Sequence, residues 1–360
     1  MKQGFHLTKR DTITPAKAWM IRLIAVLCSL VVCGLVIMAI TGDNPVKVYA
    51  ALINGAVGSK NRLWNTIRSM MLLLVVASGL TPAFRMRFWN IGGEGQILVG
   101  GIAAAGMMIY LGNSVPNALL IPMILITSAF CGMVWGLIPA FFKAVFNTNE
   151  TLFTLMLNYV AIQVTNFAII LWETPKGSNT VGVINQGTRG GWFPKLFGAN
   201  DTMIVILVLA VTAAVSIYMR YSKQGYEIAV VGESRDTARY VGINVKRVIL
   251  RTMMISGGIC GMAGAIIVCG ASHTISVGIT GGRGFTAIIV AWMAHFNAFA
   301  MGLVSAFLAF MQQGAIQIAT QFGLNENASE IITGIILFFL IGSEFFINYK
   351  IERTKGGTGA

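Results

Sequence analysis

Apolar stretches long enough to cross a lipid bilayer recur from one end of this sequence to the other. A transmembrane helix needs about 20 mostly apolar residues. Stretches of that kind lie near 19–41, 64–84, 116–142, 150–172, 201–219, 247–270, 299–320 and 328–348. Two more, at 89–111 and 284–297, are interrupted by glycine or short. The pattern predicts an all-α polytopic membrane protein of about ten transmembrane segments.

The charge content supports a membrane protein and excludes several other classes. Charged residues make up 11% of the 360, against about 25% in soluble globular domains. The net charge of +13 lies mainly between the apolar stretches, as orientation in a bilayer requires, so we expect no nucleic-acid partner. The 5 cysteines fall inside apolar stretches without a CxxC pair, and no histidine has ligand spacing to another. We therefore expect neither disulfides nor a metal site.

The positions of Lys and Arg predict how the chain is oriented. If the N-terminus is cytoplasmic and ten segments alternate, most of the 26 basic residues are cytoplasmic, as the positive-inside rule requires. Both termini are then cytoplasmic, and dropping 284–297 would place the basic C-terminus outside. The first stretch is about twice as long as a signal-peptide core and lacks a cleavage pattern, so we expect it to be retained in the cytoplasmic membrane.

We expect a single transmembrane domain over residues 1–360, with related halves. The first half is predicted at 19–219, a cytoplasmic loop at 220–246 and the second half at 247–348. Two pairs of strings relate the halves: GGEG at 92–95 with GGRG at 281–284, and NTNE at 147–150 with NEN at 325–327. In the ten-segment arrangement the paired spans run in opposite directions, as in an inverted repeat of five plus five. Chance recurrence among 41 glycines is the alternative.

The string FWNIGGEGQ at residues 88–96 places a glutamate among glycines beside an uncharged stretch. A carboxylate there is costly unless it has partners or water, and closely spaced glycines leave the backbone bendable. Broken membrane segments of this kind line pathways. We therefore predict a translocation path containing small and polar residues of this string and of other spans. These are Asn90, Gly92, Gly93, Glu94, Gln96, Asn158, Gly284 and Phe285.

The loop at 220–246 is strongly basic and contains a predicted short helix. Ser234 is a suitable N-cap and Gly242 a stop signal, which favours a helix over Ser234–Tyr240. Arg235 and Arg239 then lie on one face of the helix, beside apolar neighbours. Composition alone leaves an ordinary positive-inside loop as the alternative. The polar loops at 43–63 and 173–200 are predicted to lie outside.

The specific string GESRDTARYVGINVKR at residues 232–247 resembles the coupling loop of ABC importer permeases in the branched-chain amino-acid, simple-sugar and nucleoside group. Three further strings are similar to its nucleoside and sugar branch, in the same order: FWNIGGEGQ, TNETLFTLMLNYVA at 148–161 and GGRGFTAIIVAW at 281–292. The resemblance is closest to the branch that depends on basic membrane lipoproteins. Thr237-Ala238, Thr286 and the run His295–Ala298 depart from the family's common residues, which leaves the exact substrate open.

The resemblance implies a vitamin-B12-type ABC importer permease that forms half of a translocation path for nucleosides or simple sugars. Implied partners are a second permease in a heterodimer, a cytoplasmic ATPase and an extracytoplasmic substrate-binding lipoprotein. The ATPase is expected to drive alternating access by pushing on the coupling residues. These are Ser234, Arg235, Thr237, Ala238, Arg239, Tyr240, Gly242 and Ile243.

ATP use is expected in a partner, because the chain has no Gly-Lys dipeptide and hence no G-x-x-x-x-G-K-[ST] phosphate loop. The string ISGG at 255–258 echoes an ATPase signature but opens an apolar span. Close helix packing through Gly257 and Gly261, which have small-xxx-small spacing, explains it better. No cofactor is expected in this chain.

The sequence is also compatible with two rival functions. An ion-coupled secondary transporter would use Glu94 or Glu330 as a titrating group and need no ATPase. A membrane-embedded enzyme is disfavoured, because the chain shows no HExxH, GxSxG or comparable catalytic cluster.

The side chain of Glu94 has two possible roles. It shapes the path and accepts hydrogen bonds from substrate hydroxyls, or it holds a bent backbone by accepting neighbouring N–H groups or pairing with Arg85 or Arg87. Asn158 is likewise either a substrate contact or one partner of an interhelical hydrogen bond, worth roughly 0.6–2 kcal/mol.

Overall fold

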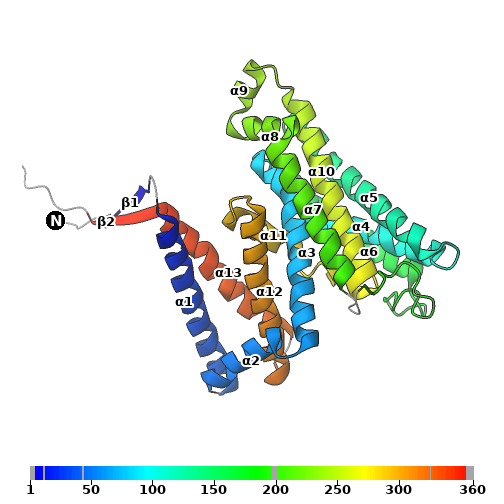
Figure 1. The fold of residues 1–360 in the computed structure, drawn as a ribbon, viewed down its shortest axis with the longest axis horizontal. Coiled ribbons are helices and arrows are strands. Elements are labelled where there is room, and N and C mark those ends of the chain that lie inside the picture. The colour runs from blue at the N-terminus through cyan, green and yellow to red at the C-terminus, as the bar shows by residue number, and fades with distance from the viewer. Residues whose placement is uncertain (1–4, 11–12, 43, 197–200, 325, 354–360) are drawn as a thin grey trace, which may run out of the picture. The chain divides into compact units, whose positions relative to one another are not determined.

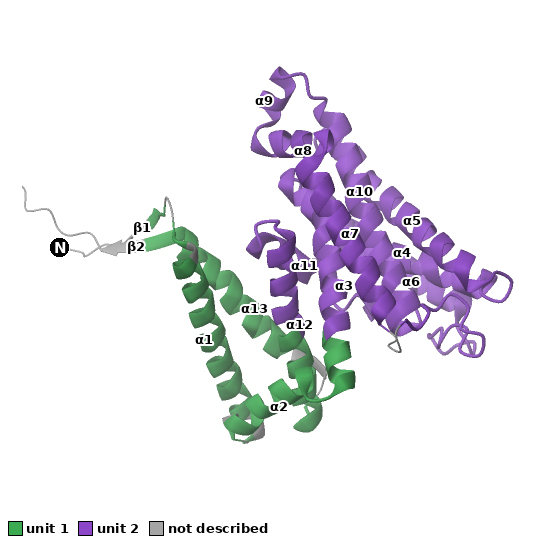
Figure 2. Cartoon of the chain, viewed as in Figure 1, with its two compact units in different colours: residues 1–66, 310–360 green, residues 67–309 purple. Residues whose placement is uncertain are grey.

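A computed structural model describes residues 5–10, 13–42, 44–196, 201–324 and 326–353. The chain divides into two compact units, one of residues 1–66 and 310–360 and the other of residues 67–309 (Figure 2). The boundaries fall inside two long helices, α3 (Lys60–Arg85) and α12 (Ala298–Gln321). The predicted halves at 19–219 and 247–348 divide the chain differently and stay a prediction.

Within the described residues, nine helices are long and apolar enough to cross a membrane. Besides α3 and α12 they are α1 (Pro15–Thr41), α4 (Gly93–Leu111), α5 (Asn117–Phe146), α6 (Glu150–Trp172), α7 (Thr202–Tyr221), α10 (Val245–Ile266), which continues as the π-helix η1 (Ile267–Ser272), and α13 (Glu326–Asn348). The predicted segment at 284–297 is the shorter α11 (Arg283–Met293), preceded by the 3₁₀ turn η2 (Val277–Thr280). An all-helical, multi-pass architecture is thus confirmed.

The first unit pairs α1 with α13, and β1 (Phe5–Lys9) runs antiparallel to β2 (Tyr349–Arg353). Arg22 and Glu344 form an ion pair at 2.6 Å between the two helices. Part of the predicted polar loop at 43–63 is instead the helix α2 (Pro45–Val57). Asn44 caps this helix by accepting the Val46 N–H at 2.9 Å, and Pro45 follows at the first position. Both are ordinary helix-start signals that outweigh the polar composition.

The second unit is organised around α10, which packs most extensively against α5 and α4 (Figure 1). Gly257 and Gly261 of α10 face the backbone of Gly132 in α5, so the two helices approach more closely than side chains would allow. The small-xxx-small spacing read from the sequence therefore corresponds to a real close contact. This contact fixes the helices that position the glycine strings.

The basic stretch after α7 forms two helices, α8 (Lys223–Glu233) and α9 (Arg235–Tyr240), where the sequence predicts only the second. Ser222 caps α8 by accepting the Gly225 N–H at 2.9 Å. Figure 1 shows both helices at one end of α7. The other predicted loop, 173–200, has no helix in its described part, residues 173–196.

Candidate functional site

The two glycine strings, far apart in sequence, meet at the start of α4. A Cβ built on Gly284 would lie 2.6 Å from the Glu94 nitrogen, and one on Gly93 would lie 3.6 Å from the Gly284 Cα. Only small residues permit this approach, which explains why both segments are glycine-rich. Glu94 lies in the first turn of α4 and Gly284 in that of α11.

Amide side chains hold the broken segment before α4 in its bent form. Asn158 of α6 accepts the Gly95 N–H at 2.9 Å and donates to the Ile91 carbonyl at 3.0 Å. Asn90 donates to Gln96 Oε1 at 3.3 Å and to Ser256 Oγ at 3.2 Å. The three amide residues of the predicted path, Asn90, Gln96 and Asn158, are all buried. Asn158 and Asn90, which accepts the Gly92 N–H at 3.1 Å, support the backbone directly, whereas Gln96 holds Asn90 in place.

Glu94 bridges the two strings directly. Its Oε1 accepts the Gly284 N–H at 2.8 Å, and the residue is only 7% exposed. No ion pair links it to Arg85 or Arg87 among the described residues. A carboxylate near the first turns of two helices is also favoured by their dipoles. Glu94 therefore fastens α11 to α4.

Aromatic rings cover the neighbouring surface. Trp89 and Trp292 stack with ring centroids 5.4 Å apart, and the buried Phe84 meets both edge-on at 5.9 and 6.1 Å. The last predicted path residue, Phe285, follows Gly284 and is 45% exposed. The predicted path residues thus form one neighbourhood at the starts of α4 and α11, but its role as a path stays a prediction.

The helix α9 has the features of a docking element. Ser234 caps it by accepting the Thr237 N–H at 3.2 Å, and Gly242 follows with a φ of 81°, as the N-cap and stop signals predict. Ala238 is fully buried, whereas Tyr240 is 93% exposed. The only described ion pair of the helix, Arg239–Asp236 at 3.3 Å, lies on the surface and contributes little stability. An exposed aromatic ring beside basic groups is available to a partner.

One apolar cluster joins α9 to the string FWNIGGEGQ. Ala238 packs in the same cluster as Met86 and Phe88, together with Ile228 of α8 and Val248 of α10. Phe88 is fully buried and begins the segment that leads to Glu94. The cluster thus forms continuous apolar packing between α9 and the connection from α3 to α4.

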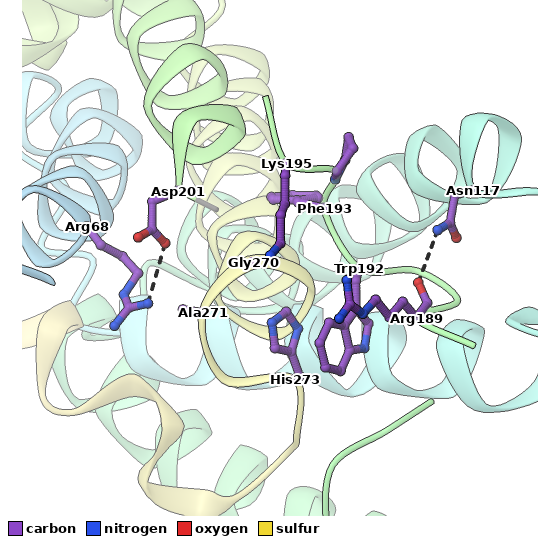
Figure 3. Close-up of a pocket in the computed structure, with 11 residues that line it drawn as sticks. Arg68, Asn117, Arg189, Trp192, Phe193, Lys195, Asp201, Gly270, Ala271 and His273 are labelled. Carbon is purple, nitrogen blue, oxygen red and sulfur yellow. Dashed lines mark hydrogen bonds and ion pairs between the residues drawn. The ribbon is translucent and has the colours of Figure 1, made fainter. Parts of the chain in front are cut away.

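At the opposite end of α7, a pocket of about 290 Å³ lies between Asp201, the end of η1 and the loop after residue 185 (Figure 3). Arg68 pairs with Asp201 at 3.4 Å, and His273 stacks on Trp192 with centroids 3.7 Å apart. Burial, and secondarily the charge of Arg68, lowers the pKa of His273. The 20 residues of α7 separate this pocket from α8 by about 30 Å.

Comparison with known proteins decides the family. The family described as "Branched-chain amino acid transport system / permease component" matches residues 62–341. The chain belongs to this permease family. The family is one of transport permeases and not of enzymes. The relatives that match are named as permeases of ABC transporters, which supports an ABC permease over an ion-coupled secondary transporter. The permease works with an ATPase and a substrate-binding partner.

Individual relatives cover nearly the whole permease. The guanosine ABC transporter permease of Bacillus subtilis is 30% identical over 341 residues, which are 93% of this chain and 96% of the relative. The nucleoside ABC transporter permease of Lactococcus lactis is 27% identical, with 89% and 90% covered. The glucose ABC transporter permease of Haloferax volcanii is 26% identical, with 98% and 94% covered. No solved structure matches the chain significantly.

Two residues of the amide network, Thr154 and Ser256, are absent from the path residues predicted from the sequence. Thr154 Oγ1 accepts the Ile91 N–H at 3.2 Å, and Ser256 receives a hydrogen bond from Asn90. Thr154 precedes Asn158 by one helical turn, which is a recognisable polar pair within an apolar span. Ser256 lies in the string ISGG, and a single hydroxyl beside two packing glycines does not by itself predict a hydrogen bond to Asn90.

The contact made by Glu94 gives a stability prediction for the permease. Glu94→Ala leaves the buried Gly284 N–H without its acceptor and should cost about 1–3 kcal/mol. Glu94→Gln keeps a carbonyl oxygen at that position, so we expect a smaller loss. Thermal unfolding of the detergent-solubilised protein measures both. Unchanged stability of Glu94→Ala, with an altered substrate preference in uptake, would instead indicate that Glu94 contacts the substrate.

Proposed function

We propose that this permease forms half of a translocation path for nucleosides, with simple sugars as the alternative substrate class. The relatives named for guanosine and nucleosides are more similar to it than the relative named for glucose, although the margin is small. A nucleoside carries both a planar base and hydroxyl groups. The exposed rings of Trp89 and Trp292 lie beside the amide-rich segment and could serve such a substrate through base stacking.

We infer a topology of ten segments in two inverted halves of five, with both termini in the cytoplasm. The nine long helices and α11 supply ten elements. The meeting of GGEG with GGRG supports a pathway at the interface between the halves, as the vitamin-B12-type architecture requires. In this orientation α8 and α9 are cytoplasmic, and the pocket in Figure 3 faces outside.

The proposed mechanism is alternating access driven from α9. The ATPase binds the exposed face of α9, with Arg235, Arg239 and Tyr240 as contacts. Its motion passes through Ala238 and the shared cluster to Phe88, and from there to the junction of Glu94 with Gly284. The observation that carries this proposal is the packing of α9 and the start of FWNIGGEGQ in one cluster.

We further propose that the permease pairs with a second, similar permease and receives substrate from an extracytoplasmic lipoprotein. Residues around the outer pocket, including Arg189 and Lys195, supply positive charge on that side. Of the remaining coupling residues, Thr237 is exposed within α9, and Gly242 and Ile243 follow the helix in the next turn, so all three stay in the proposed coupling region.

Uptake measurements test the substrate class and the energy source together. Cells that carry the permease with its partner subunits should take up radiolabelled guanosine, and excess unlabelled nucleoside should compete better than excess glucose. Depletion of ATP should stop uptake, whereas an ionophore at maintained ATP should not. Competition by glucose but not by nucleosides would show that the substrates are simple sugars. The family and the proposed coupling mechanism would be unaffected by that result.

A further inference from the structure

A second cavity in the residue 67–309 unit, of about 720 Å³, is lined where α3 and α7 end and where α8 and α12 begin. Its charged lining residues are Arg85, the last residue of α3, and Arg220, near the end of α7. No Asp or Glu lines it. Among the described residues, neither guanidinium pairs with a carboxylate. The cavity therefore carries uncompensated positive charge.

Two helix N-termini add to this positive field. Gly225 and Tyr226, in the first turn of α8, line the cavity, as do Asn297 and Ala298 at the start of α12. The N–H groups at both helix starts already have acceptors, since Gly225 donates to Ser222 Oγ at 2.9 Å and Phe299 to Asn297 Oδ1 at 3.0 Å. These helix starts therefore contribute through their dipoles and not through free N–H donors. Arg85 and Arg220 stand at the C-terminal ends of α3 and α7. The negative dipole ends of these two helices balance the positive ends of α8 and α12, so the two guanidinium charges decide the sign of the field. The charge balance selects an anionic ligand.

Most of the remaining lining is apolar or has its hydroxyl groups bonded within its own helix, while His295 and Tyr226 add polar side chains at the exposed edge. Met219 and Met301 are 6% and 2% exposed and lie on opposite helices, α7 and α12. The hydroxyl of Thr81 donates to the Ala77 carbonyl at 2.8 Å, and that of Ser216 to the Thr212 carbonyl at 2.8 Å. These hydroxyl hydrogens are therefore not available to a polyol. A ligand with an anionic group and an apolar body fits the lining better than a free sugar or nucleoside.

We propose that this cavity binds the phosphate of an anionic phospholipid. The two guanidinium groups form charge-assisted hydrogen bonds to phosphate oxygens, and the first acyl carbons lie against the methionines. Cationic pockets between membrane helices are suited to such headgroups. Because α3, α7 and α12 have the length and apolarity of spans, their ends lie at headgroup depth. The lipid would brace the end of α3 against α8, which leads directly into α9.

The test is a titration of the purified full-length permease, in phosphatidylcholine–detergent micelles, with dioleoylphosphatidylglycerol. The readout is the thermal unfolding midpoint, from which an apparent dissociation constant follows. Arg85→Gln with Arg220→Gln should weaken binding about 30-fold, because each charge contributes about 1 kcal/mol and 1.4 kcal/mol is tenfold. Lys246→Gln with Arg247→Gln removes the same charge from an exposed site outside the cavity and should leave binding unchanged.

A second variant separates the cavity from general electrostatics. Ala229→Phe narrows the cavity without changing any charge and should weaken the stabilisation. A third arm replaces the lipid by sn-glycerol 3-phosphate, which should not stabilise the protein. Equal stabilisation of the wild type and both cavity variants by the lipid would overturn the proposal. Stabilisation by glycerol phosphate that is lost in the same variants would also overturn it, in favour of a soluble phosphate ligand.

Discussion

Uptake should be lost completely when Arg239→Glu and Tyr240→Asp are combined, while the permease remains folded and inserted. The two side chains lie on the exposed face of α9, and Tyr240 is 93% exposed. Their replacement places two negative charges where a basic and aromatic surface is proposed to meet the ATPase. Unfavourable charges in a docking contact cost several kcal/mol, and truncation of a buried aromatic anchor costs 2 kcal/mol or more. Co-purification of the ATPase with the tagged permease measures the loss of docking, and uptake of radiolabelled guanosine measures the loss of transport.

Stability should not change, because the buried anchor of α9 is untouched. Ala238 keeps its place in the apolar cluster with Met86 and Phe88, and Ser234 keeps its cap on the Thr237 N–H. Changes at exposed positions without such contacts usually stay within about 0.5 kcal/mol. Thermal unfolding of the variant and the wild type in detergent checks this directly.

A matched control is Lys223→Glu with Tyr221→Asp, which makes the same two kinds of change one helix earlier. Both residues are exposed, and neither belongs to α9. We expect this control to keep the ATPase bound and uptake intact. Equal loss in the control and the α9 variant would place the docking surface elsewhere and contradict its assignment to α9.

Much of this fold follows from the sequence, because a bilayer imposes length and composition on each span. The predicted stretch at 116–142 corresponds to α5, and that at 150–172 has the bounds of α6. The short helix α9 is also predicted, since Ser234 and Gly242 act locally as cap and stop. The failures are helices that lack an uninterrupted apolar run. Both α2 and α8 begin with good N-caps, at Asn44 and Ser222, but with 13 and 11 residues they are too short to be recognised as spans.

The candidate site is predicted only in part, because its defining contact joins residues distant in sequence. Glycine spacing identifies the strings around Glu94 and Gly284, and their similarity indicates related positions. It does not predict that the Glu94 carboxylate accepts the Gly284 N–H, or that Asn158 supports the backbone at Gly95. The sequence offers either neighbouring N–H groups or Arg85 and Arg87 as structural partners of Glu94. The structure provides an N–H group, but from the distant Gly284, since a helix start supplies donors without a second buried charge.

Close contact between α10 and α5 should make Gly261 intolerant of even one methyl group. A Cβ at this position would lie 2.8 Å from the Gly132 Cα and closer still to the Ser128 carbonyl oxygen. Both are backbone atoms, so neither can move without displacing α5. Overpacking of a tight interior costs typically 1–3 kcal/mol, and a backbone clash should be at the upper end. We therefore expect Gly261→Ala to lose about 3 kcal/mol of unfolding free energy.

Gly258 supplies a control on the same helix, one turn earlier. A Cβ there would meet the Ala129 carbonyl oxygen at 3.5 Å, which is ordinary contact. Replacement of glycine by alanine within a helix is intrinsically favourable by about 1 kcal/mol, and this gain applies equally at both positions. Gly258→Ala should therefore be neutral or slightly stabilising, and the difference between the variants isolates the interhelical contact. Unfolding in mixed detergent and dodecyl sulfate micelles measures both free energies. Equal values would mean that α5 and α10 separate in solution, and the transmission from α9 to Glu94 would then lack its rigid support.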